Sequence, residues 1–276
     1  MNATTRRLTD THCHLVLPQF DQDRVKVLER AWEADVHRIL VPGINLHTSR
    51  LAVELAQQHA NIFAAVGIHP HDARTWNSDT AAEIGELARS EGVVAIGEIG
   101  LDYYRNISTP EQQKHAFQAQ LALAAEIGLP VVIHNRDATE EIIEILLAWS
   151  RDLPARLRDR AGVLHAYSAD TENALLAAES GFYFGVAGPV TFRKADYLRG
   201  VVSKLPISKI LLETDSPYLT PHPHRGKRNE PANVSYIAKS FAGIMDMQES
   251  QATEITWQNA ATLFEWNHGN NNHHLL

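Results

Sequence analysis

Two histidines stand one residue apart near the start of the chain, in the stretch Thr11-His12-Cys13-His14. On an extended segment both imidazoles point to the same face, because side chains alternate with a period of two. Such a pair can bind one metal ion from the end of a single strand. By itself, His-x-His fits two structural histidines equally well, so the interpretation depends on the rest of the chain.

Four more residues with metal-binding side chains each end a later apolar run: Glu98, His134, His165 and Asp215. Together with His12 and His14 they make six potential ligands at the ends of five candidate strands. Four imidazoles and two carboxylates suit a pair of divalent ions ~3.5–4 Å apart, a separation that lets one carboxylate contact both. The sequence therefore predicts a two-metal site.

The predicted ligand scheme gives each ion its own pair of histidines. One ion takes His12, His14 and Asp215, the other takes His134 and His165, and Glu98 bridges the two. Water completes both coordination shells, and a water whose pKa is lowered by the metal is the expected nucleophile. Asp215 would orient that water or take its proton. Imidazole ligands favour Zn, Mn, Fe or Ni, and oxygen-rich surroundings also admit Mg, so the ligand types predict two divalent ions without deciding the metal.

Further polar residues are expected near the same site. His69 stays extended because a proline follows it, and either contacts a substrate phosphate or is structural. Arg136 lies two residues beyond His134, shares its face, and is a candidate clamp for a phosphate oxyanion. Glu213 shares the face of Asp215 one step deeper, where it would support the ligands rather than bind metal.

The loop that follows the last predicted strand is basic. Arg225, Lys227 and Arg228 fall within four residues, and we interpret them as a phosphate cradle rather than a solvated loop. Tyr103 and Tyr104 follow Asp102. Their rings either stack on a base of the substrate or pack within the loop, and the sequence does not decide between these two roles.

Strand-like and helix-like runs alternate through the whole chain, which is typical of a parallel sheet with crossover helices. The predicted strands after the first one are 38–43, 62–68, 93–96, 130–134, 162–165, 182–186 and 209–215. The predicted helices are 21–34, 49–59, 80–90, 110–127, 139–149, 171–180, 195–204, 233–247 and 249–264. Eight strand–helix units predict an α/β fold, a single (β/α)8 TIM barrel over residues 1–267, with a flexible tail at 268–276. In such a barrel the C-terminal ends of the strands meet at one mouth, which would bring the six ligands together.

The composition is that of an ordinary globular protein, with 44% hydrophobic and 21% charged residues. No run approaches the ~20 apolar residues of a membrane span, and the first ten residues lack an apolar signal core, so we expect a cytoplasmic location and no membrane partner. The net charge of −8 argues against a protein that coats nucleic acid, but allows a local basic patch. Cys13, the only cysteine, is expected to be a small buried thiol.

Six motifs between about residue 8 and residue 265 resemble one family: Asp10-Thr11-His12-Cys13-His14, Gly67-Ile68-His69-Pro70, Gly97-Glu98-Ile99-Gly100-Leu101-Asp102, Val132-Ile133-His134, Glu213-Thr214-Asp215-Ser216-Pro217-Tyr218-Leu219 and Arg228-Asn229-Glu230-Pro231. Together they resemble the TatD family of metal-dependent deoxyribonucleases, a branch of the amidohydrolase-type barrels. The resemblance implies His12 and His14 on one ion, a glutamate bridge, and hydrolysis of phosphodiester bonds with Mg, Mn or Zn.

Two details of the resemblance bear on the substrate. Many related barrels bridge their ions with a carbamylated lysine, and Glu98 at the corresponding strand end favours the nuclease branch. The family commonly has His-Cys-Phe-Ser-Gly after the sixth strand, whereas this chain has His165-Ala166-Tyr167-Ser168-Ala169. The ligand histidine is kept, and the lost glycine bears on how closely the backbone approaches substrate there.

Three functions follow from these residues. The first is a two-metal phosphodiesterase that acts on DNA from a single-stranded end, and the resemblance to the TatD family implies a 3′–5′ exonuclease. The second is a hydrolase of a non-nucleic-acid ester, lactone or amide with the same ions, which the acidic net charge favours. The third is a non-catalytic protein whose metal is structural, which requires closed coordination shells.

Overall fold

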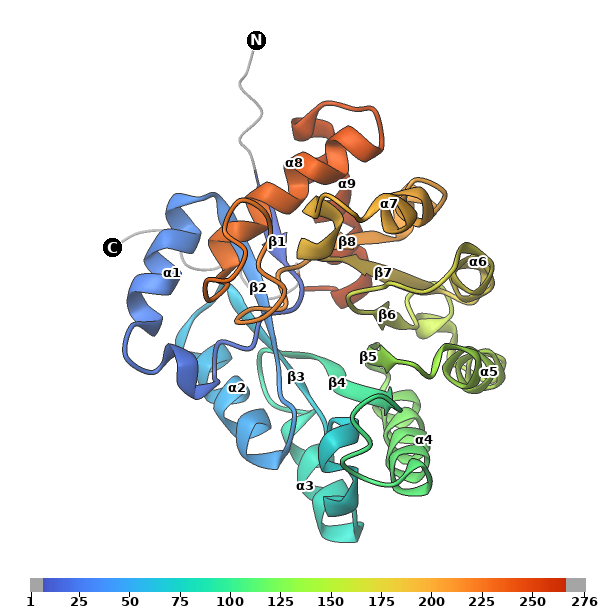
Figure 1. The fold of residues 1–276 in the computed structure, drawn as a ribbon. Helices are drawn as coiled ribbons and strands as arrows, with labels where there is room; N and C mark the ends of the chain where they lie inside the picture. Colours follow the sequence, from blue (N-terminus) through green and yellow to red (C-terminus); the bar gives the residue numbers. More distant parts are fainter. Residues whose placement is uncertain (1–6, 267–276) are drawn as a thin grey trace.

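The computed structural model describes residues 7–266, and its centre is a ring of eight parallel strands (Figure 1). Each strand pairs with the next one along the chain, in the order β1 to β8. The strands are β1 Leu8–Asp10, β2 Val36–Pro42, β3 Ile62–Val66, β4 Val93–Asp102, β5 Val131–Arg136, β6 Gly162–Leu164, β7 Phe182–Val186 and β8 Ile210–Leu212. This order confirms the predicted (β/α)8 barrel.

Helices α1 to α7 connect successive strands on the outside of the ring, and α8 and α9 follow the last strand (Figure 1). They are α1 Arg24–Glu33, α2 Leu46–Gln58, α3 Ser78–Leu87, α4 Pro110–Ile127, α5 Thr139–Ser150, α6 Thr171–Glu179, α7 Asp196–Val202, α8 Val234–Ile244 and α9 Glu249–Phe264. Helix α4 follows its local sequence closely: Thr109 and Gln112 form the predicted capping box, and Gly128 ends the helix at φ 78°. That φ lies in the left-handed region, which glycine adopts without steric cost.

The barrel closes between β8 and β1 through single contacts rather than a regular ladder. The Thr11 N–H donates to the Leu212 carbonyl at 3.1 Å, and Cys13 forms an isolated parallel bridge with Ser216. Beside them, the buried Asp10 carboxylate accepts hydrogen bonds from the backbone N–H of Thr214 at 2.8 Å and from its hydroxyl at 2.5 Å. These bonds bring the chain after β1 next to the chain after β8.

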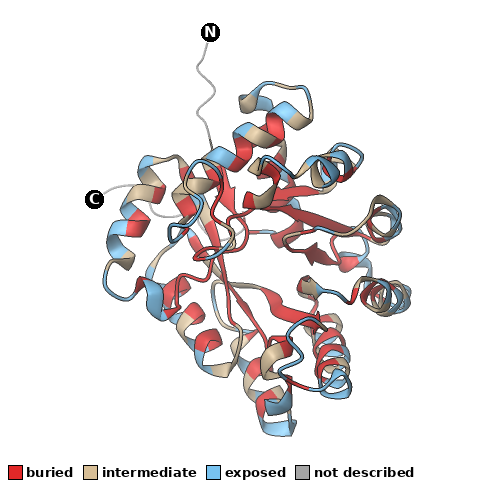
Figure 2. Cartoon of the chain, viewed as in Figure 1, coloured by how far each residue is buried: buried red, intermediate tan, exposed pale blue. Residues whose placement is uncertain are grey.

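Two apolar layers fill the molecule, and the strands are red, that is buried, on both faces in Figure 2. The outer layer packs the strands against the surrounding helices. The inner layer combines strand residues such as Leu40, Val132 and Leu211 with Leu263 and Phe264 of α9. Helix α9 therefore fills the N-terminal end of the barrel, which leaves polar residues to the C-terminal mouth.

Several predicted boundaries are shifted at the mouth. Strand β4 continues through Glu98 to Asp102, with an irregular register against β5 between Ile96 and Ile99, whereas the sequence predicted an end at Ile96. Strand β8 covers Ile210–Leu212 and so ends earlier than the predicted 209–215.

Cys13 is fully buried, as predicted. Within the described residues, no helix is both long and apolar enough to cross a membrane. The domain boundary at residue 267 stays a prediction, and the tail predicted at 268–276 lies outside the described residues.

Candidate metal centre

The two histidines of the first motif converge as their spacing predicts. The Nε2 atoms of His12 and His14 lie 3.1 Å apart, and both rings are buried. Regular pairing in β1 ends at Asp10, but the bridge at Cys13 keeps the segment extended. Alternation therefore continues, so Cys13 packs into the apolar core while its two neighbours face the barrel axis.

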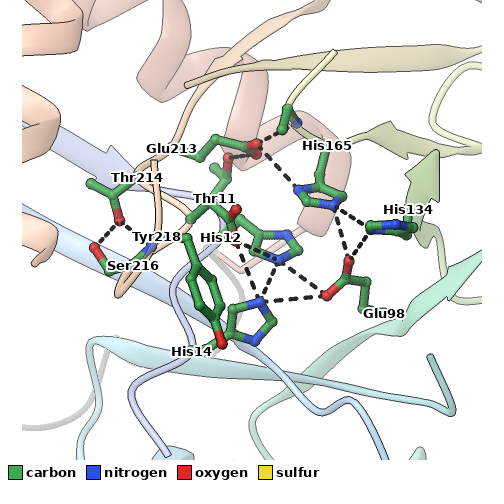
Figure 3. A network of polar contacts seen from close by, with 12 residues as sticks. Thr11, His12, His14, Glu98, His134, His165, Glu213, Thr214, Ser216 and Tyr218 are labelled. Carbon is green, nitrogen blue, oxygen red and sulfur yellow. Dashed lines mark hydrogen bonds and ion pairs between the residues drawn. The ribbon is translucent and has the colours of Figure 1, made fainter. Parts of the chain in front are cut away.

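Glu98 lies at the centre of the cluster and divides its two oxygens between two sets of histidines (Figure 3). Its Oε2 lies 3.4 Å from His12 Nε2 and 3.5 Å from His14 Nε2. Its Oε1 lies 2.9 Å from both His134 Nδ1 and His165 Nε2. The carboxylate is almost fully buried. Each of its oxygens faces one pair of histidines.

Asp215 completes the side that holds the first two histidines. Its Oδ1 lies 3.4 Å from His14 Nε2 and 3.8 Å from His12 Nε2. The residue follows β8 with φ 55°, a left-handed conformation that aspartate tolerates better than most residues. This turn separates it from Glu213, whose side chain lies deeper in the barrel.

The ring nitrogens of His134 have two different partners. Nδ1 faces Glu98, whereas Nε2 lies 3.3 Å from the Asp102 Oδ2 atom. If a metal ion occupied Nδ1, the ring proton would lie on Nε2, where the Asp102 carboxylate can accept it. The lone pair on Nδ1 is then directed into the cluster, where a ligand atom is needed.

His165 is held in a similar way. Its Nε2 faces Glu98, and its Nδ1 lies 3.6 Å from Glu213 Oε1. Glu213 is fully buried and also accepts the Ala166 N–H at 2.5 Å. Two carboxylates thus orient the two histidines on one side of Glu98.

His69 differs from the other histidines in the direction of its proton. Its Nδ1 accepts the backbone N–H of His71 at 3.1 Å, and burial holds its pKa well below the usual range. The neutral ring therefore carries its proton on Nε2, which lies 3.5 Å from Glu98 Oε1. A protonated nitrogen cannot bind metal, so this ring is a hydrogen-bond donor beside the cluster.

The cluster has the electrostatics of a cation site. Burial raises the pKa of Glu98, but the surrounding histidines outweigh it and hold this pKa well below the usual range. Burial disfavours charge on Asp215 too, yet the hydrogen bond from His14 and the nearby rings lower its pKa. Burial lowers the pKa of His12, whose ring stacks on that of His165 at 4.0 Å. Two ionised carboxylates thus face imidazole rings that are either neutral or carry a proton that a metal ion can displace.

The donor set fits divalent ions. Three sets of nitrogen and oxygen atoms each lie within 4.8 Å of one another: His12, His14 and Glu98; His12, His165 and Asp215; and His69, Glu98 and His134. In the third set, His69 acts as the hydrogen-bond donor, so Glu98 and His134 are its candidate ligands. Imidazole nitrogens and carboxylate oxygens are the ligands of transition-metal hydrolases. The structure thus brings all six predicted ligand residues to one end of the barrel.

Comparisons with known proteins agree with this geometry. The model of the family described as TatD related DNase matches residues 9–265. The chain belongs to this TatD family. It is 42% identical to the metal-dependent hydrolase YabD of Bacillus subtilis over 260 residues, which is 94% of this chain and all of that protein. It is 39% identical to the 3′–5′ ssDNA/RNA exonuclease TatD of Shigella flexneri, over 92% of this chain and 98% of that protein.

Solved structures give the same result. The TatD homologue YJJV of Escherichia coli K12 superposes with a TM-score of 0.87 at 30% identity, over 94% of this chain and 98% of that chain. A TatD-family hydrolase of Entamoeba histolytica superposes with a TM-score of 0.81 at 21% identity, which shows the shared fold. As a TatD-family member this chain is a metal-dependent hydrolytic nuclease, and hydrolysis of a non-nucleic-acid ester or amide is not favoured.

The sequence analysis of this TatD-family protein did not identify two acidic residues that hold predicted ligand histidines in place. Asp10 lies two residues before His12 and accepts its N–H at 3.3 Å, and burial raises its pKa to about 8. Asp102 lies four residues after Glu98 on β4 and accepts from both His134 and His71. In both cases the acidic residue lies an even number of positions from a predicted ligand on the same extended segment. This spacing puts the two side chains on one face and could have identified the acidic residue from the sequence.

Of the predicted substrate contacts in this TatD-family protein, Arg136 is exposed at the end of β5. Its guanidinium carbon lies 4.7 Å from the centre of the Tyr104 ring. In the loop after β8, Arg225 is exposed and stacks on Phe192 at 4.0 Å. Lys227 in the same loop is exposed as well.

Arg228 differs from the prediction. Its guanidinium forms a two-pronged pair with Asp23 at 2.8 and 2.7 Å, donates to the Gln19 carbonyl, and lies over the Phe20 ring. These contacts join the loop after β8 to the loop after β1. Its charge is therefore already neutralised by an acidic partner that lies far away in the sequence.

Replacing Asp102 with alanine is expected to weaken metal binding about 10–100-fold, because His134 loses the acceptor that fixes its ring. Titration of the purified protein with Mn²⁺, followed by electron paramagnetic resonance, measures this loss. Glu141→Gln is the matched control, since Glu141 accepts from the Tyr103 hydroxyl in the same region. An unchanged affinity for both ions in the alanine variant would contradict this role.

Proposed function

We propose that this nuclease removes nucleotides from the 3′ end of single-stranded DNA, with two divalent ions bridged by Glu98. The observation that carries the proposal is the division of the Glu98 oxygens between the His12–His14 pair and the His134–His165 pair. A carboxylate with a purely structural role would not need a pair of histidines, able to bind metal, beside each of its two oxygens. Two-metal sites with a shared carboxylate are typical of phosphodiester hydrolysis.

In this proposal each side chain has one task. His12, His14 and Asp215 hold one ion, His134 and His165 hold the other, and Glu98 contacts both. Ions bound in this way lower the pKa of water and neutralise charge on phosphate oxygens. Mg, Mn and Zn are the candidates, because imidazole and carboxylate ligands suit all three.

Asp215 is the proposed proton acceptor. Its lowered pKa keeps it ionised at neutral pH, and its side chain is 13% exposed. An ionised carboxylate at the edge of the cluster can orient the attacking water through a hydrogen bond and take the proton that the water loses as it attacks phosphorus.

His69 is the proposed donor to the phosphate. Its Nε2–H already points toward the Glu98 side of the cluster, where a phosphate oxygen of the substrate would be bound. Arg136, Arg225 and Lys227 are proposed to hold neighbouring phosphates, since all three are exposed. Arg228 is assigned instead to bracing the loop against Asp23.

The polarity of cleavage tests the proposal directly. A single-stranded DNA labelled at its 5′ end is expected to give a ladder of products that shorten from the 3′ end, in the presence of Mn²⁺ or Mg²⁺. The same strand blocked by a 3′-phosphorothioate linkage is expected to resist. Products that shorten from the 5′ end, or internal cuts in a circular strand, would contradict exonuclease action.

A parallel assay with the RNA version of the strand distinguishes a DNA-specific enzyme from one that takes either sugar. The cytoplasmic location expected from the sequence remains a prediction.

Metal binding is expected to release protons near neutral pH. Burial lowers the pKa of His165, but Glu98 and Glu213 outweigh it and hold this pKa well above its usual value, so the metal-free ring is protonated at pH 7. An ion must displace that proton, and apparent metal affinity therefore rises with pH and falls in acid. Calorimetric titration in two buffers of different ionisation enthalpy is expected to show a net release of protons. Heats that do not depend on the buffer would contradict this.

A further inference from the structure

Two tyrosines at the mouth of the barrel are unusually exposed for aromatic residues. Tyr104 is 60% exposed and Tyr218 is 50% exposed. By contrast, Tyr103 is partly buried against the core and donates its hydroxyl to Glu141 at 2.5 Å. Tyr103 therefore packs the loop, whereas its neighbour presents a ring to solvent.

Tyr104 is attached to one side of the centre. Its backbone N–H donates to Asp102 Oδ1 at 3.1 Å, and the other oxygen of the same carboxylate contacts His134. Two guanidinium groups accompany the ring, with Arg136 at 4.7 Å and Arg105 at 5.8 Å from its centre. An exposed aromatic ring beside two cations offers a face for a base and charges for the adjoining phosphates.

Tyr218 is attached to the other side of the centre. Its backbone N–H donates to the Asp215 carbonyl at 2.8 Å, and its own carbonyl accepts from the buried Asn229 side chain at 2.7 Å. Its ring lies edge-on to that of His14, with centres 6.3 Å apart, and Figure 3 shows it alongside that histidine. The position of this ring is therefore fixed relative to the cluster.

The topology places the two rings on opposite sides of the centre. Tyr104 follows β4 and Tyr218 follows β8, which are four strands apart in an eight-stranded ring. The cluster around Glu98 lies between them, linked to Tyr104 through Asp102 and to Tyr218 through Asp215. A chain of nucleotides bound across the mouth would meet one ring on each side of the bond that is cut.

We propose that Tyr104 and Tyr218 are two base-stacking sites, one for the nucleobase on each side of the scissile phosphate. This inference rests on the proposed nuclease function and adds the two side chains that would bind the last two bases of an unpaired strand. A base within a duplex has both faces stacked on its neighbours and its edge paired, so it cannot lie flat on a fixed tyrosine. Selection of single strands then follows from the site itself.

The test combines a substitution at each tyrosine with the removal of each of the last two bases of the substrate. Tyr104→Ala and Tyr218→Ala are assayed on a single-stranded oligonucleotide and on the same strand with an abasic residue at the last or the next-to-last position. Each variant is expected to raise KM on the intact strand roughly five- to hundredfold, with little change in kcat. The effect of each variant is expected to vanish when its own base is missing, and the two variants are expected to select different positions.

Controls separate stacking from other roles of the side chains. Tyr104→Phe and Tyr218→Phe keep the ring and are expected to keep the wild-type KM. Tyr197→Ala removes a third exposed tyrosine, on α7, and is expected to have no effect. Hydrolysis of bis(p-nitrophenyl) phosphate by the wild type serves as a separate measure of phosphodiesterase activity on a small phosphodiester that is not a nucleic acid.

The outcomes distinguish this inference from the proposed function. If the wild type shortens strands from the 3′ end but neither alanine variant changes KM, the stacking sites are wrong and the nuclease remains. An equal increase in KM on intact and abasic strands would also overturn the proposed stacking sites. If the wild type hydrolyses only the small phosphodiester and does not retain a fluorescent oligonucleotide in an anisotropy assay, the nucleic acid substrate itself is wrong, and the stacking sites with it.

Discussion

Replacing Glu98 with glutamine is expected to lower kcat on single-stranded DNA about a thousandfold or more. The substitution keeps the volume of the side chain but removes the charge that lies within 3.5 Å of His12, His14, His134 and His165. An amide has one carbonyl oxygen, so it cannot present an acceptor to both sides. Loss of a bridging ligand removes several kcal/mol of charge stabilisation, and each 1.4 kcal/mol corresponds to a tenfold change in rate.

Two further measurements make the Glu98 result specific. Metal content determined by mass spectrometry is expected to fall in the glutamine variant, and circular dichroism is expected to show an intact fold. Glu141→Gln, which removes a carboxylate that contacts Tyr103 and Lys114, is the matched control and is expected to keep wild-type activity. If Glu98→Gln cleaves DNA as fast as the wild type, the bridging role is refuted.

Removal of metal is expected to abolish measurable cleavage altogether. Without ions, the described site offers carboxylates and imidazoles that would repel or merely hydrogen-bond a phosphodiester, because Glu98 and Asp215 both have lowered pKa values and carry negative charge. Dialysis against a chelator should therefore eliminate activity, and added Mn²⁺, Mg²⁺ or Zn²⁺ should restore it. The ratio of metal to protein at half-restoration reports how many ions are needed.

The metal-removal experiment has its own control. The chelator saturated with Ca²⁺ before addition tests whether it inhibits by a route other than metal capture. Activity that persists at a metal content far below one ion per chain would rule out the two-metal scheme, and full restoration at one ion per chain would rule out the second ion.

Local rules explain why much of the barrel was predictable. Helix α4 begins at the capping box of Thr109 and Gln112 and ends at Gly128 because these bonds form within one or two turns of the chain. Likewise, the alternation of side chains along β5 puts Val132 and His134 on one face, and both point inward in the structure. The six ligand residues met because parallel strands bring their C-terminal ends to one mouth.

Contacts between distant segments explain what the sequence did not predict. The irregular register of β4 against β5 that surrounds Glu98 depends on a neighbouring strand rather than on the local sequence. The neutralisation of Arg228 by Asp23 joins residues 205 positions apart. In the same way, Tyr103 is partly buried and donates its hydroxyl to Glu141 of α5, while Tyr104 stays exposed, although two adjacent tyrosines look equivalent in the sequence.

The sequence by itself determined the barrel and the end of the barrel at which the six predicted ligand residues gather, since periodicity, capping and residue type act over a few neighbouring positions. Only the tertiary structure decided which oxygen of Glu98 faces which histidines, that Asp102 orients His134, and which tyrosine is free for a substrate. Each of these depends on distances between side chains from different strands, and those distances exist only after the barrel has closed.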